Sequence, residues 1–489
     1  MPGFLLTMAA LLGAASGQPL PPPDMSTYFG ASHWQPCYFL NASLPSLLDG
    51  AAALAATGSR IIKVHFAADF PWNSPLWPAA GFPDLVSTAT HPYFVSLFTN
   101  ALPGAAFQTY VLVAFSVGQG DFCGTYSAAD AANDVAQFSA LTQHLFSAYS
   151  GTGKRFVLQS WENDWAARCG SYNASQPADP RVQANMVRWL QARQDGVSAG
   201  RAAACRQAGW GSAPSACAAS GQAAFMAAAG LQVYHAAEVN LVHAAMAQGF
   251  PNNVLKVLPH VALDMVSYSS YDTMATRELG AALDFIADHH NRTAAAPTPG
   301  IAIGEFGVPE MLSAPGAVAQ VVANVLGFAL SAGAGASNGG VRRAAYALYW
   351  ETIDNEVRGE PGRSRCTAAS GPEFNTSHLN GFWLVRPDGS EAYTFGAMRG
   401  FINGSLPLPT PPSGTACTLL QDTDVTGVEG AGVAHIGGQG QAAWEACCAL
   451  CNAAPGTCGA AVFLAGDCYL KGFGGSLWSN PGRVACVPS

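Results

Sequence analysis

Short apolar runs alternate with longer segments of mixed character along most of the chain. Apolar runs of four to eight residues predict buried strands, and segments with apolar residues every three or four positions predict helices. The expected strands cover residues 26–31, 60–66, 110–115, 156–160, 231–236, 262–267, 300–305 and 345–350. The expected helices lie between them, at residues 45–57, 128–149, 180–204, 241–246, 277–289 and 318–331.

Eight strand and helix units in succession are typical of a (β/α)8 TIM barrel, an α/β fold whose parallel strands close into a ring. A doubly wound open sheet also alternates strands and helices, but it more often has a Gly-rich phosphate-binding turn after its first strand. The turn here, residues 30–34 (GASHW), lacks that pattern. We therefore expect residues 26–403 to form a barrel, with the apolar stretch 317–336 as a barrel helix and not a membrane span.

The chain changes character after residue 403. A Pro-rich linker covers residues 404–416, and residues 417–489 hold seven of the thirteen cysteines. This density predicts a small module held together by disulfides. The cluster Cys447-Cys448-x-x-Cys451 lacks the second ligand pair of a zinc finger, so no metal site is expected. Because seven is odd, one thiol is free, pairs with the barrel or pairs between chains.

Composition narrows the class of protein further. Of the 489 residues, 49% are hydrophobic and 11% are charged, which suits a large core. The net charge of −9 and the lack of any basic run argue against a nucleic-acid partner.

The N-terminus predicts export from the cell. An apolar run followed by small residues reads as a signal peptide over residues 1–17, and residues 18–25 form a Pro-rich leader. Thirteen cysteines and several N-x-S/T sequons agree with an oxidising, glycosylating route to the outside or to a lumenal compartment. The sequon asparagines are Asn41, Asn173, Asn291, Asn375 and Asn403.

Two expected strands end on a glutamate. Glu162 follows the fourth strand, and Glu305 ends the seventh within Ile303-Gly304-Glu305-Phe306-Gly307. A buried carboxylate is costly unless it is paired or used, and the strands of a TIM barrel bring their C-terminal ends to one rim. Two carboxylates facing each other there suit glycoside hydrolysis, with retention at a separation of about 5 Å and inversion at a larger one.

This arrangement resembles the large clan of retaining (β/α)8 glycoside hydrolases that includes cellulases, mannanases and β-galactosidases. The resemblance implies that Glu305 is the nucleophile and Glu162 the acid/base, with no cofactor. It also implies that Trp350 forms the floor of a sugar site and that Tyr268 or Tyr271 holds the nucleophile ionised. The chain departs from the clan at Trp161, where an Asn usually precedes the acid/base. Asn163 follows Glu162 instead, and Asp164 is the nearest substitute for the acid/base, although it reads equally well as a cap of the next helix.

Further candidates lie near the strand ends. Aromatic and imidazole side chains suit sugar binding, and the expected substrate-binding set is Trp34, His65, Trp161, His235, Tyr268, Tyr271 and Trp350. Other polar side chains at strand ends read equally well as ion pairs inside the barrel; they are Lys63, Glu238, Asp264, Glu351 and Asp354. His235, Glu238 and His243 lack the H-E-x-x-H spacing of a metal site.

The C-terminal cysteine pattern resembles a PAN/apple domain, a helix clipped to a small sheet that binds protein or carbohydrate. The resemblance implies disulfides among Cys417, Cys486, Cys447, Cys468, Cys451 and Cys458, with Cys417 and Cys486 as the outer pair. The resulting hypothesis is a secreted glycoside hydrolase targeted by a binding module. The alternatives are a barrel that binds carbohydrate or protein without catalysis, and a transglycosylase.

Overall fold

The computed structural model describes most of the barrel and part of the C-terminal region. The described residues are 20–70, 72, 77–78, 80–171, 173, 176–211, 214–313, 316–333, 341–357, 376–411, 417–426, 429–435, 446–448, 450–451, 460–464, 467–471 and 476–488. The expected signal peptide (1–17), the first two leader residues, Asn375, Cys458 and part of the linker lie outside these residues.

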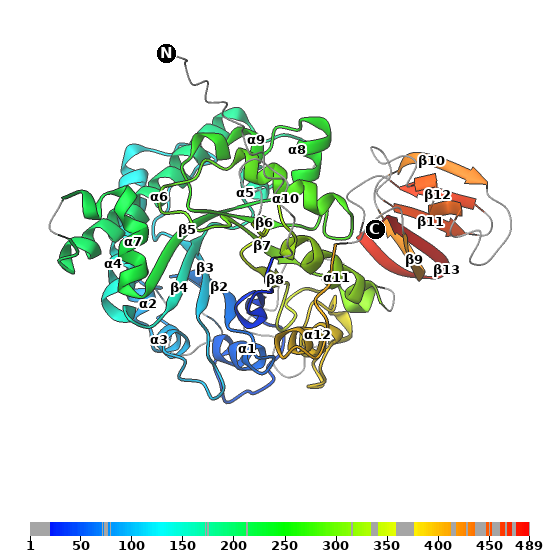
Figure 1. Ribbon diagram of the computed structural model, residues 1–489, viewed down its shortest axis with the longest axis horizontal. Coiled ribbons are helices and arrows are strands. Elements are labelled where there is room, and N and C mark those ends of the chain that lie inside the picture. Colours follow the sequence, from blue (N-terminus) through cyan, green and yellow to red (C-terminus); the bar gives the residue numbers. More distant parts are fainter. Residues whose placement is uncertain are drawn as a thin grey trace, which may run out of the picture.

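Eight parallel strands close into a barrel in chain order, as predicted (Figure 1). The strands are β1 (Phe29–His33), β2 (Ile61–Ala67), β3 (Thr109–Phe115), β4 (Lys154–Gln159), β5 (Leu231–Val239), β6 (Met265–Ser269), β7 (Ile301–Phe306) and β8 (Ala347–Tyr349). Closure follows from the pairing of β1 with β8, in which Ala31 lies opposite Tyr349. The two ends of the barrel segment are therefore neighbours in space.

Helices surround the ring of strands (Figure 1). They are α1 (Ser46–Ala55), α2 (Leu85–Ala89), α3 (Pro92–Phe98), α4 (Ala128–Tyr149), α5 (Asn163–Ala166), α6 (Pro180–Gln207), α7 (Gln222–Ala229), α8 (Val242–Gln248), α9 (Asn253–Lys256), α10 (Glu278–His289), α11 (Ala317–Leu330) and α12 (Tyr393–Ile402). Short 3-10 turns cover Met25–Thr27, Pro214–Cys217, Ala219–Gly221, Leu258–His260, Glu310–Leu312 and Thr376–His378. The expected barrel helix in the stretch 317–336 is α11. Within the described ranges, every helix is too short or too polar to cross a bilayer.

Local sequence explains where several elements begin and end. Helix α4 has the predicted bounds because Ser127 and Asp130 form a capping box at its N-terminus. Strand β1 begins three residues later than predicted because Asp24 accepts the backbone N–H of Ser26 at 3.0 Å, which starts a 3-10 turn over Met25–Thr27. Gly196 lets α6 approach α4 closely, since a Cβ there would lie 2.7 Å from Cβ of Phe138.

The C-terminal region forms a separate antiparallel sheet (Figure 1). Its strands are β9 (Cys417–Thr426), β10 (Glu429–His435), β11 (Ala460–Leu464), β12 (Asp467–Lys471) and β13 (Ser476–Pro488), in the order β10-β12-β11-β13-β9. Of the expected disulfide cysteines, Cys447 bonds to Cys468, and Cys451 is also disulfide-bonded. The backbones of Cys417 and Cys486 lie on the paired strands β9 and β13; their side chains lie outside the described part.

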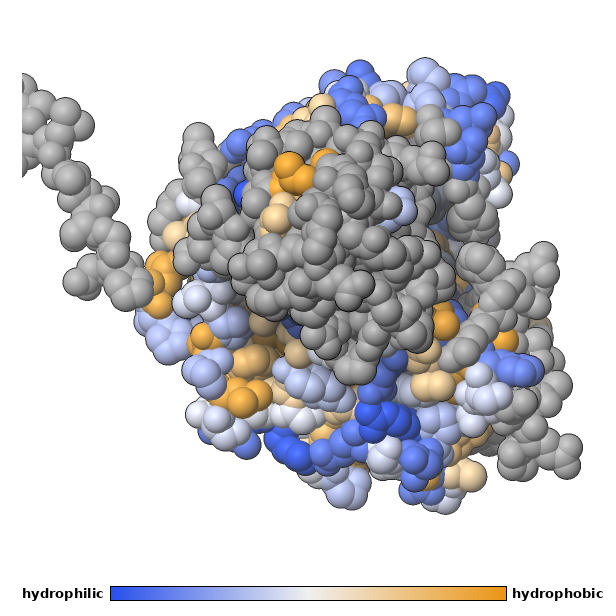
Figure 2. Space-filling model, turned by 90° about the vertical axis from the view of Figure 1, so that its right-hand side faces the viewer, coloured by the Kyte–Doolittle hydropathy of each residue, from blue (hydrophilic) through white to orange (hydrophobic). Residues whose placement is uncertain are grey.

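Four sequon asparagines are exposed: Asn41, Asn173, Asn291 and Asn403. Figure 2 shows that the described surface on this face mixes hydrophilic with scattered hydrophobic residues. Large exposed hydrophobic side chains belong to many different elements; they include Phe39, Val95, Trp210, Tyr393 and Leu450.

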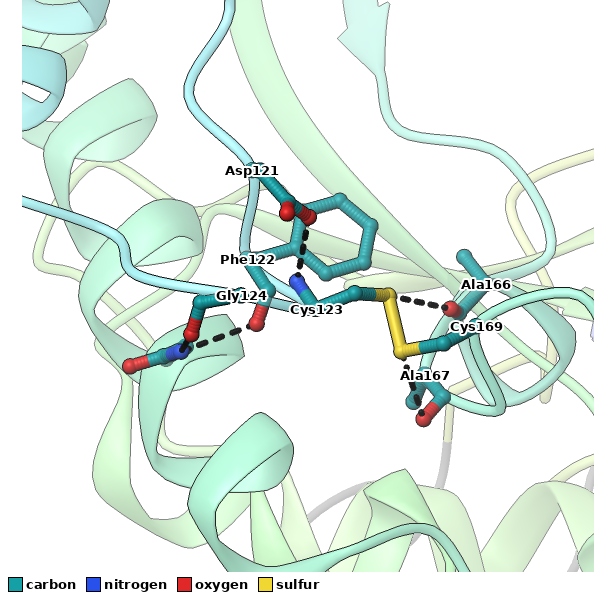
Figure 3. Close-up of a disulfide and its surroundings, with 8 residues drawn as sticks. Asp121, Phe122, Cys123, Gly124, Ala166, Ala167 and Cys169 are labelled. Carbon is teal, nitrogen blue, oxygen red and sulfur yellow. Dashed lines mark hydrogen bonds between the residues drawn. A yellow bond between two sulfur atoms is a disulfide. The ribbon is translucent and has the colours of Figure 1, made fainter.

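A disulfide joins the loop after β3 to the segment after α5 (Figure 3). It connects Cys123 and Cys169, which are 46 residues apart in sequence. Asp121 accepts the backbone N–H of Cys123 at 2.9 Å, and the Asn185 amide donates to the carbonyl of Phe122 at 2.8 Å. Both joined segments follow the C-terminal ends of their strands, so the bond fixes one side of that rim.

Replacing Cys123 and Cys169 together by Ala is expected to lower the free energy of unfolding by up to about 4 kcal/mol, because a long loop of the unfolded chain is released. The matched control is the pair Cys205 and Cys217, which are only 12 residues apart and should cost about 3 kcal/mol. Urea denaturation measures both values. A larger loss for the short loop would contradict the loop-entropy argument.

Candidate active site

Glu305 lies on β7 and is buried at the C-terminal end of the barrel, 2% exposed. Its Oε1 accepts from Lys63 Nζ at 2.6 Å and from the indole N–H of Trp161 at 3.0 Å. Its Oε2 accepts from the Ser269 hydroxyl at 3.3 Å. The donors come from β2, from the segment after β4 and from β6, so three separate parts of the ring fix this carboxylate.

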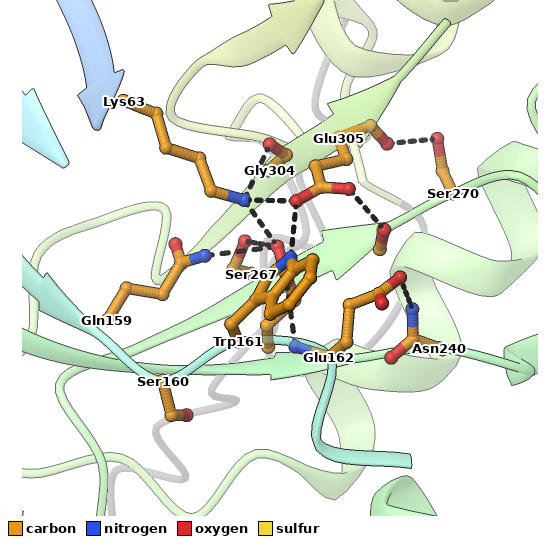
Figure 4. Close-up of polar contacts among 12 residues, drawn as sticks. Lys63, Gln159, Ser160, Trp161, Glu162, Asn240, Ser267, Ser270, Gly304 and Glu305 are labelled. Carbon is orange, nitrogen blue, oxygen red and sulfur yellow. Dashed lines mark hydrogen bonds and ion pairs between the residues drawn. The ribbon is translucent and has the colours of Figure 1, made fainter. Parts of the chain in front are cut away.

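Glu162 lies directly after β4, at the start of α5, and is partly exposed. Its backbone is in the left-handed region, with φ 42° and ψ 52°. Its Oε1 accepts from the Asn240 amide at 3.3 Å, and its N–H donates to Glu238 Oε2 at 2.9 Å. Figure 4 shows Glu162 and Glu305 in one cluster with Lys63 and Trp161. The sequence-predicted pair therefore belongs to one site.

The two carboxyl groups influence each other's ionisation. Burial raises the pKa of Glu162 well above its usual value, and the negative charges of Glu305 and Glu238 raise it further. Burial also raises the pKa of Glu305, to about 7, against the opposite effect of the Lys63 ammonium and the Trp161 hydrogen bond. One carboxyl thus favours its protonated form, while the other has two donors ready to stabilise its charge.

Aromatic side chains line the same end of the barrel. The ring of Trp34 lies 5.2 Å from that of Trp161 and 5.6 Å from that of Trp350, measured between centroids. Tyr271 packs against this cluster, and His65 lies 4.6 Å from Trp34. Trp161 and Tyr271 are partly exposed, so the cluster offers ring surface beside the carboxylates.

Two predicted substrate-binding residues lie elsewhere. His235 accepts from Arg193 Nε of α6 at 3.2 Å and packs near Phe138 of α4. Tyr268 donates to Asp272, and its hydroxyl is 2.8 Å from that of Thr273. Both substrate-binding predictions were wrong. Successive side chains on a strand point to opposite faces, and these two residues take the face turned away from the barrel interior.

The alternation can be followed on the neighbouring residues. Glu238 on β5 and Ser267 on β6 point into the barrel and meet at 3.2 Å. Positions at odd spacing from them, His235 and Tyr268, consequently face the surrounding helices. Of the two tyrosines that the sequence left open, Tyr271 is the one beside the carboxylates: the charges of Glu305, Glu356 and Glu162 all raise its pKa, after burial.

Asn163 and Asp164, which follow Glu162 in the sequence, both make structural contacts. The amide of Asn163 is turned to the Ser160 hydroxyl at 2.8 Å. Asp164 accepts the backbone N–H groups of Asn240 and Asn253, at 2.8 and 2.7 Å. The amide that actually reaches Glu162 belongs to Asn240, after β5.

The sequence reading allowed Lys63 to pair with a carboxylate inside the barrel without naming the partner, and the structure shows Lys63 paired with Glu238 at 2.9 Å. It did not foresee that Lys63 is shared with Glu305 at 2.6 Å. It also missed Glu356, which accepts from the Trp350 indole at 3.0 Å and from Asn380 at 3.2 Å. No periodic signal marks Glu356, because it lies in a loop after β8.

Among the residues that the structure describes, no three His, Cys, Asp or Glu side chains gather in a way that would hold a metal ion. The cation at the centre of this cluster is the Lys63 ammonium.

No family model matches the chain, and no curated protein is similar enough to count as a relative. Solved structures with a similar barrel do exist. A GH5_18 protein from Streptomyces cattleya, in complex with Manb1-4GlcNAc, is 12% identical, with a TM-score of 0.41 over 78% of this chain and 82% of that one.

Two further structures are similar at the same level. A GH5_18 protein from Bifidobacterium longum subsp. longum is 12% identical, with a TM-score of 0.43 over 79% of this chain and 81% of that one. A family 39 glycoside hydrolase from Bacteroides cellulosilyticus is 9% identical, with a TM-score of 0.43 over 96% and 82%. At such identities and TM-scores the similarity does not define an activity, so the function has to be argued from this chain's own residues.

Proposed function

We propose that the barrel is a glycoside hydrolase that cleaves O-glycosidic bonds by a retaining mechanism. The observation that carries the proposal is a pair of carboxyl groups in different surroundings. Lys63 and Trp161 donate hydrogen bonds to Oε1 of Glu305, whereas burial raises the pKa of Glu162 and so favours its protonated form. Oε2 of Glu305 has only the longer contact with Ser269 among the described residues. This is the oxygen that we assign to attack the anomeric carbon.

The reaction then has two steps. A bond forms between Glu305 and the anomeric carbon while the bond to the leaving oxygen breaks, and Glu162 gives its proton to that oxygen. In the second step Glu162 takes a proton from water, whose oxygen displaces Glu305 from the sugar. Lys63 and Trp161 stabilise the carboxylate in the free enzyme and again as it departs.

We assign sugar contact to the aromatic cluster. Trp161 and Tyr271 are partly exposed and pack against the buried rings of Trp34 and Trp350, and the C–H face of a pyranose stacks on such aromatic surfaces. His65 packs against Trp34 and orients it.

The test is hydrolysis of a panel of aryl glycosides and polysaccharides by the purified protein, with the anomeric form of the first product followed by NMR. Retention supports the two-step mechanism. Inversion would mean that Glu305 activates water. Failure to cleave any substrate while still binding glycans would favour the non-catalytic binding protein, and products longer than the substrate would indicate a transglycosylase.

We also propose that the antiparallel sheet after residue 417 is a PAN/apple-like module that binds a glycan or protein, and that the chain is exported with residues 1–17 as its signal. Five strands and the Cys447–Cys468 bond support the first point. The disulfides and the four exposed sequon asparagines support the second.

The pH dependence of kcat/KM is expected to be bell-shaped with its maximum in the neutral range. Activity should rise as pH approaches 7, because Glu305 must lose its proton and its pKa is about 7. It should fall at higher pH as Glu162, whose pKa is also raised, loses the proton it donates. A profile already flat at pH 5 would contradict these assignments. The measurement is kcat/KM from pH 4 to 10.

A further inference from the structure

Glu238 on β5 is wholly buried, and both of its carboxylate oxygens have partners. Oε1 accepts from Lys63 Nζ at 2.9 Å, from the Gln159 amide at 3.0 Å and from the Ser267 hydroxyl at 3.2 Å. Oε2 accepts the backbone N–H of Glu162 at 2.9 Å. Four donors therefore satisfy the hydrogen-bonding capacity of this buried carboxylate. The catalytic steps described above do not use it.

One oxygen of Glu238 fixes the backbone of the proposed acid/base. Glu162 has φ 42°, in the left-handed region that residues with a side chain rarely adopt. If the side chain at position 238 were shorter, the backbone N–H of Glu162 would lose its acceptor in the barrel interior. Since the left-handed backbone sets the direction of the Glu162 side chain, the contact at Oε2 helps to aim that carboxyl.

The other oxygen acts on the proposed nucleophile through Lys63. The ammonium lies between Glu238 Oε1 at 2.9 Å and Glu305 Oε1 at 2.6 Å, and it also donates to the carbonyl of Gly304 at 3.3 Å. Figure 4 shows the Lys63 side chain reaching Glu305 from β2. Two carboxylates on opposite sides leave the ammonium little freedom to move.

The space for this contact depends on a glycine. A Cβ at Gly304 would lie 1.8 Å from the Ser267 hydroxyl and 2.8 Å from Glu238 Oε1. The glycine before Glu305 therefore leaves room inside the barrel for the Glu238 carboxylate, next to Glu162 and Glu305.

We propose that Glu238 is a positioning residue for this site: with one oxygen it holds the backbone of Glu162, and with the other it holds Lys63 against Glu305. The inference rests on the proposed function, because it assigns Glu162 and Glu305 the roles given there. It adds a connection between them that passes through a single side chain.

The charge of Glu238 also bears on pH. Its negative charge raises the pKa of both Glu162 and Glu305, after burial and, for Glu305, against Lys63. The other ionisable groups around these three carboxyls are Lys63 and His65 on β2, Tyr271 after β6, Tyr346 before β8, which faces Glu238, and Glu356 after β8. Neutralising Glu238 should move both limbs of the pH profile to lower pH.

Two variants separate the charge of Glu238 from its contact with Glu162. Glu238→Gln removes the charge, and with its amide oxygen toward Lys63 its NH2 group faces the N–H of Glu162, from which it cannot accept. We expect both limbs to move to lower pH and kcat to fall about tenfold to hundredfold, with KM within about threefold. Glu238→Asp keeps the charge but is one methylene shorter, so it should lose the N–H of Glu162. We expect kcat to fall with the limbs unmoved.

The control is Asp264→Asn, which removes another buried carboxylate that pairs with Arg201 at 2.9 Å on the outer side of the strands. It should lower the melting temperature without moving either limb. Unchanged limbs in folded Glu238→Gln would overturn the proposal. If that variant fails to fold, Glu238→Asp decides, since a kcat equal to that of the unmodified protein would overturn it.

A second readout is independent of turnover. Protein labelled with 13C at the Glu carboxyl carbons can be titrated by NMR, with the Glu162 and Glu305 signals assigned from their Gln variants. Both should titrate at lower pH in Glu238→Gln, and unmoved titrations would contradict the coupling. If the unmodified protein cleaves no glycoside, the proposed function fails while this titration still tests the connection.

Discussion

Glu305→Gln should lower kcat by about 1000-fold or more, because the amide cannot form the covalent intermediate. The fold should persist, because the amide oxygen can still accept from Lys63 Nζ, which lies 2.6 Å from Glu305 Oε1 in the unmodified protein. Lys63 also keeps its pairing with Glu238. Steady-state kinetics on the best aryl glycoside measure the loss.

The matched control for this variant is Glu391→Gln, which neutralises a carboxylate on the surface that pairs with Arg399 at 2.7 Å. It should leave kcat unchanged. Retained activity in Glu305→Gln would rule out Glu305 as the nucleophile, whereas equal losses in both variants would point to a general effect of charge.

Lys63→Met is expected to lower the free energy of unfolding at pH 7 by about 3–5 kcal/mol, because it leaves two buried carboxylates without their shared cation. The loss should shrink toward pH 5. Without the ammonium the pKa of Glu305 rises further above that of the unfolded chain. Stability from such a group is present at low pH and is lost as pH rises through the folded pKa. Urea denaturation at several pH values measures it.

Lys256→Met on α9 is the control, because this lysine is exposed and should change stability by less than about 0.5 kcal/mol. Adding Glu238→Gln and Glu305→Gln to Lys63→Met should restore much of the stability at pH 7. A loss that does not depend on pH would show that Lys63 acts by packing instead of by charge.

The sequence predicted the barrel because every strand is buried on both sides and therefore reads as an apolar run. The predicted runs 110–115 and 300–305 are examples, and they correspond to β3 (Thr109–Phe115) and β7 (Ile301–Phe306). The first residue of a strand differs from the prediction where a polar side chain reorganises the backbone, as Asp24 does before β1.

The candidate site was harder to predict residue by residue. Glu162 and Glu305 were found because carboxylates interrupt apolar strands. His235 and Tyr268 were misplaced because a strand's apolar run does not reveal which face each residue takes when both faces are buried. Asn240 lies beyond a strand end, where its direction depends on Asp164 holding its backbone at 2.8 Å.

The shared ammonium of Lys63 has a consequence for how the chain can be divided. Strands β1 to β4 carry the cation, whereas β5 to β8 carry the two anions that surround it, Glu238 and Glu305. Each half-barrel expressed alone would bury a charged side chain without its ion-pair partner. Co-expressed halves would form the Lys63 ion pairs only when they associate. The two halves should therefore be recovered as a complex, and their separate fragments should be poorly folded.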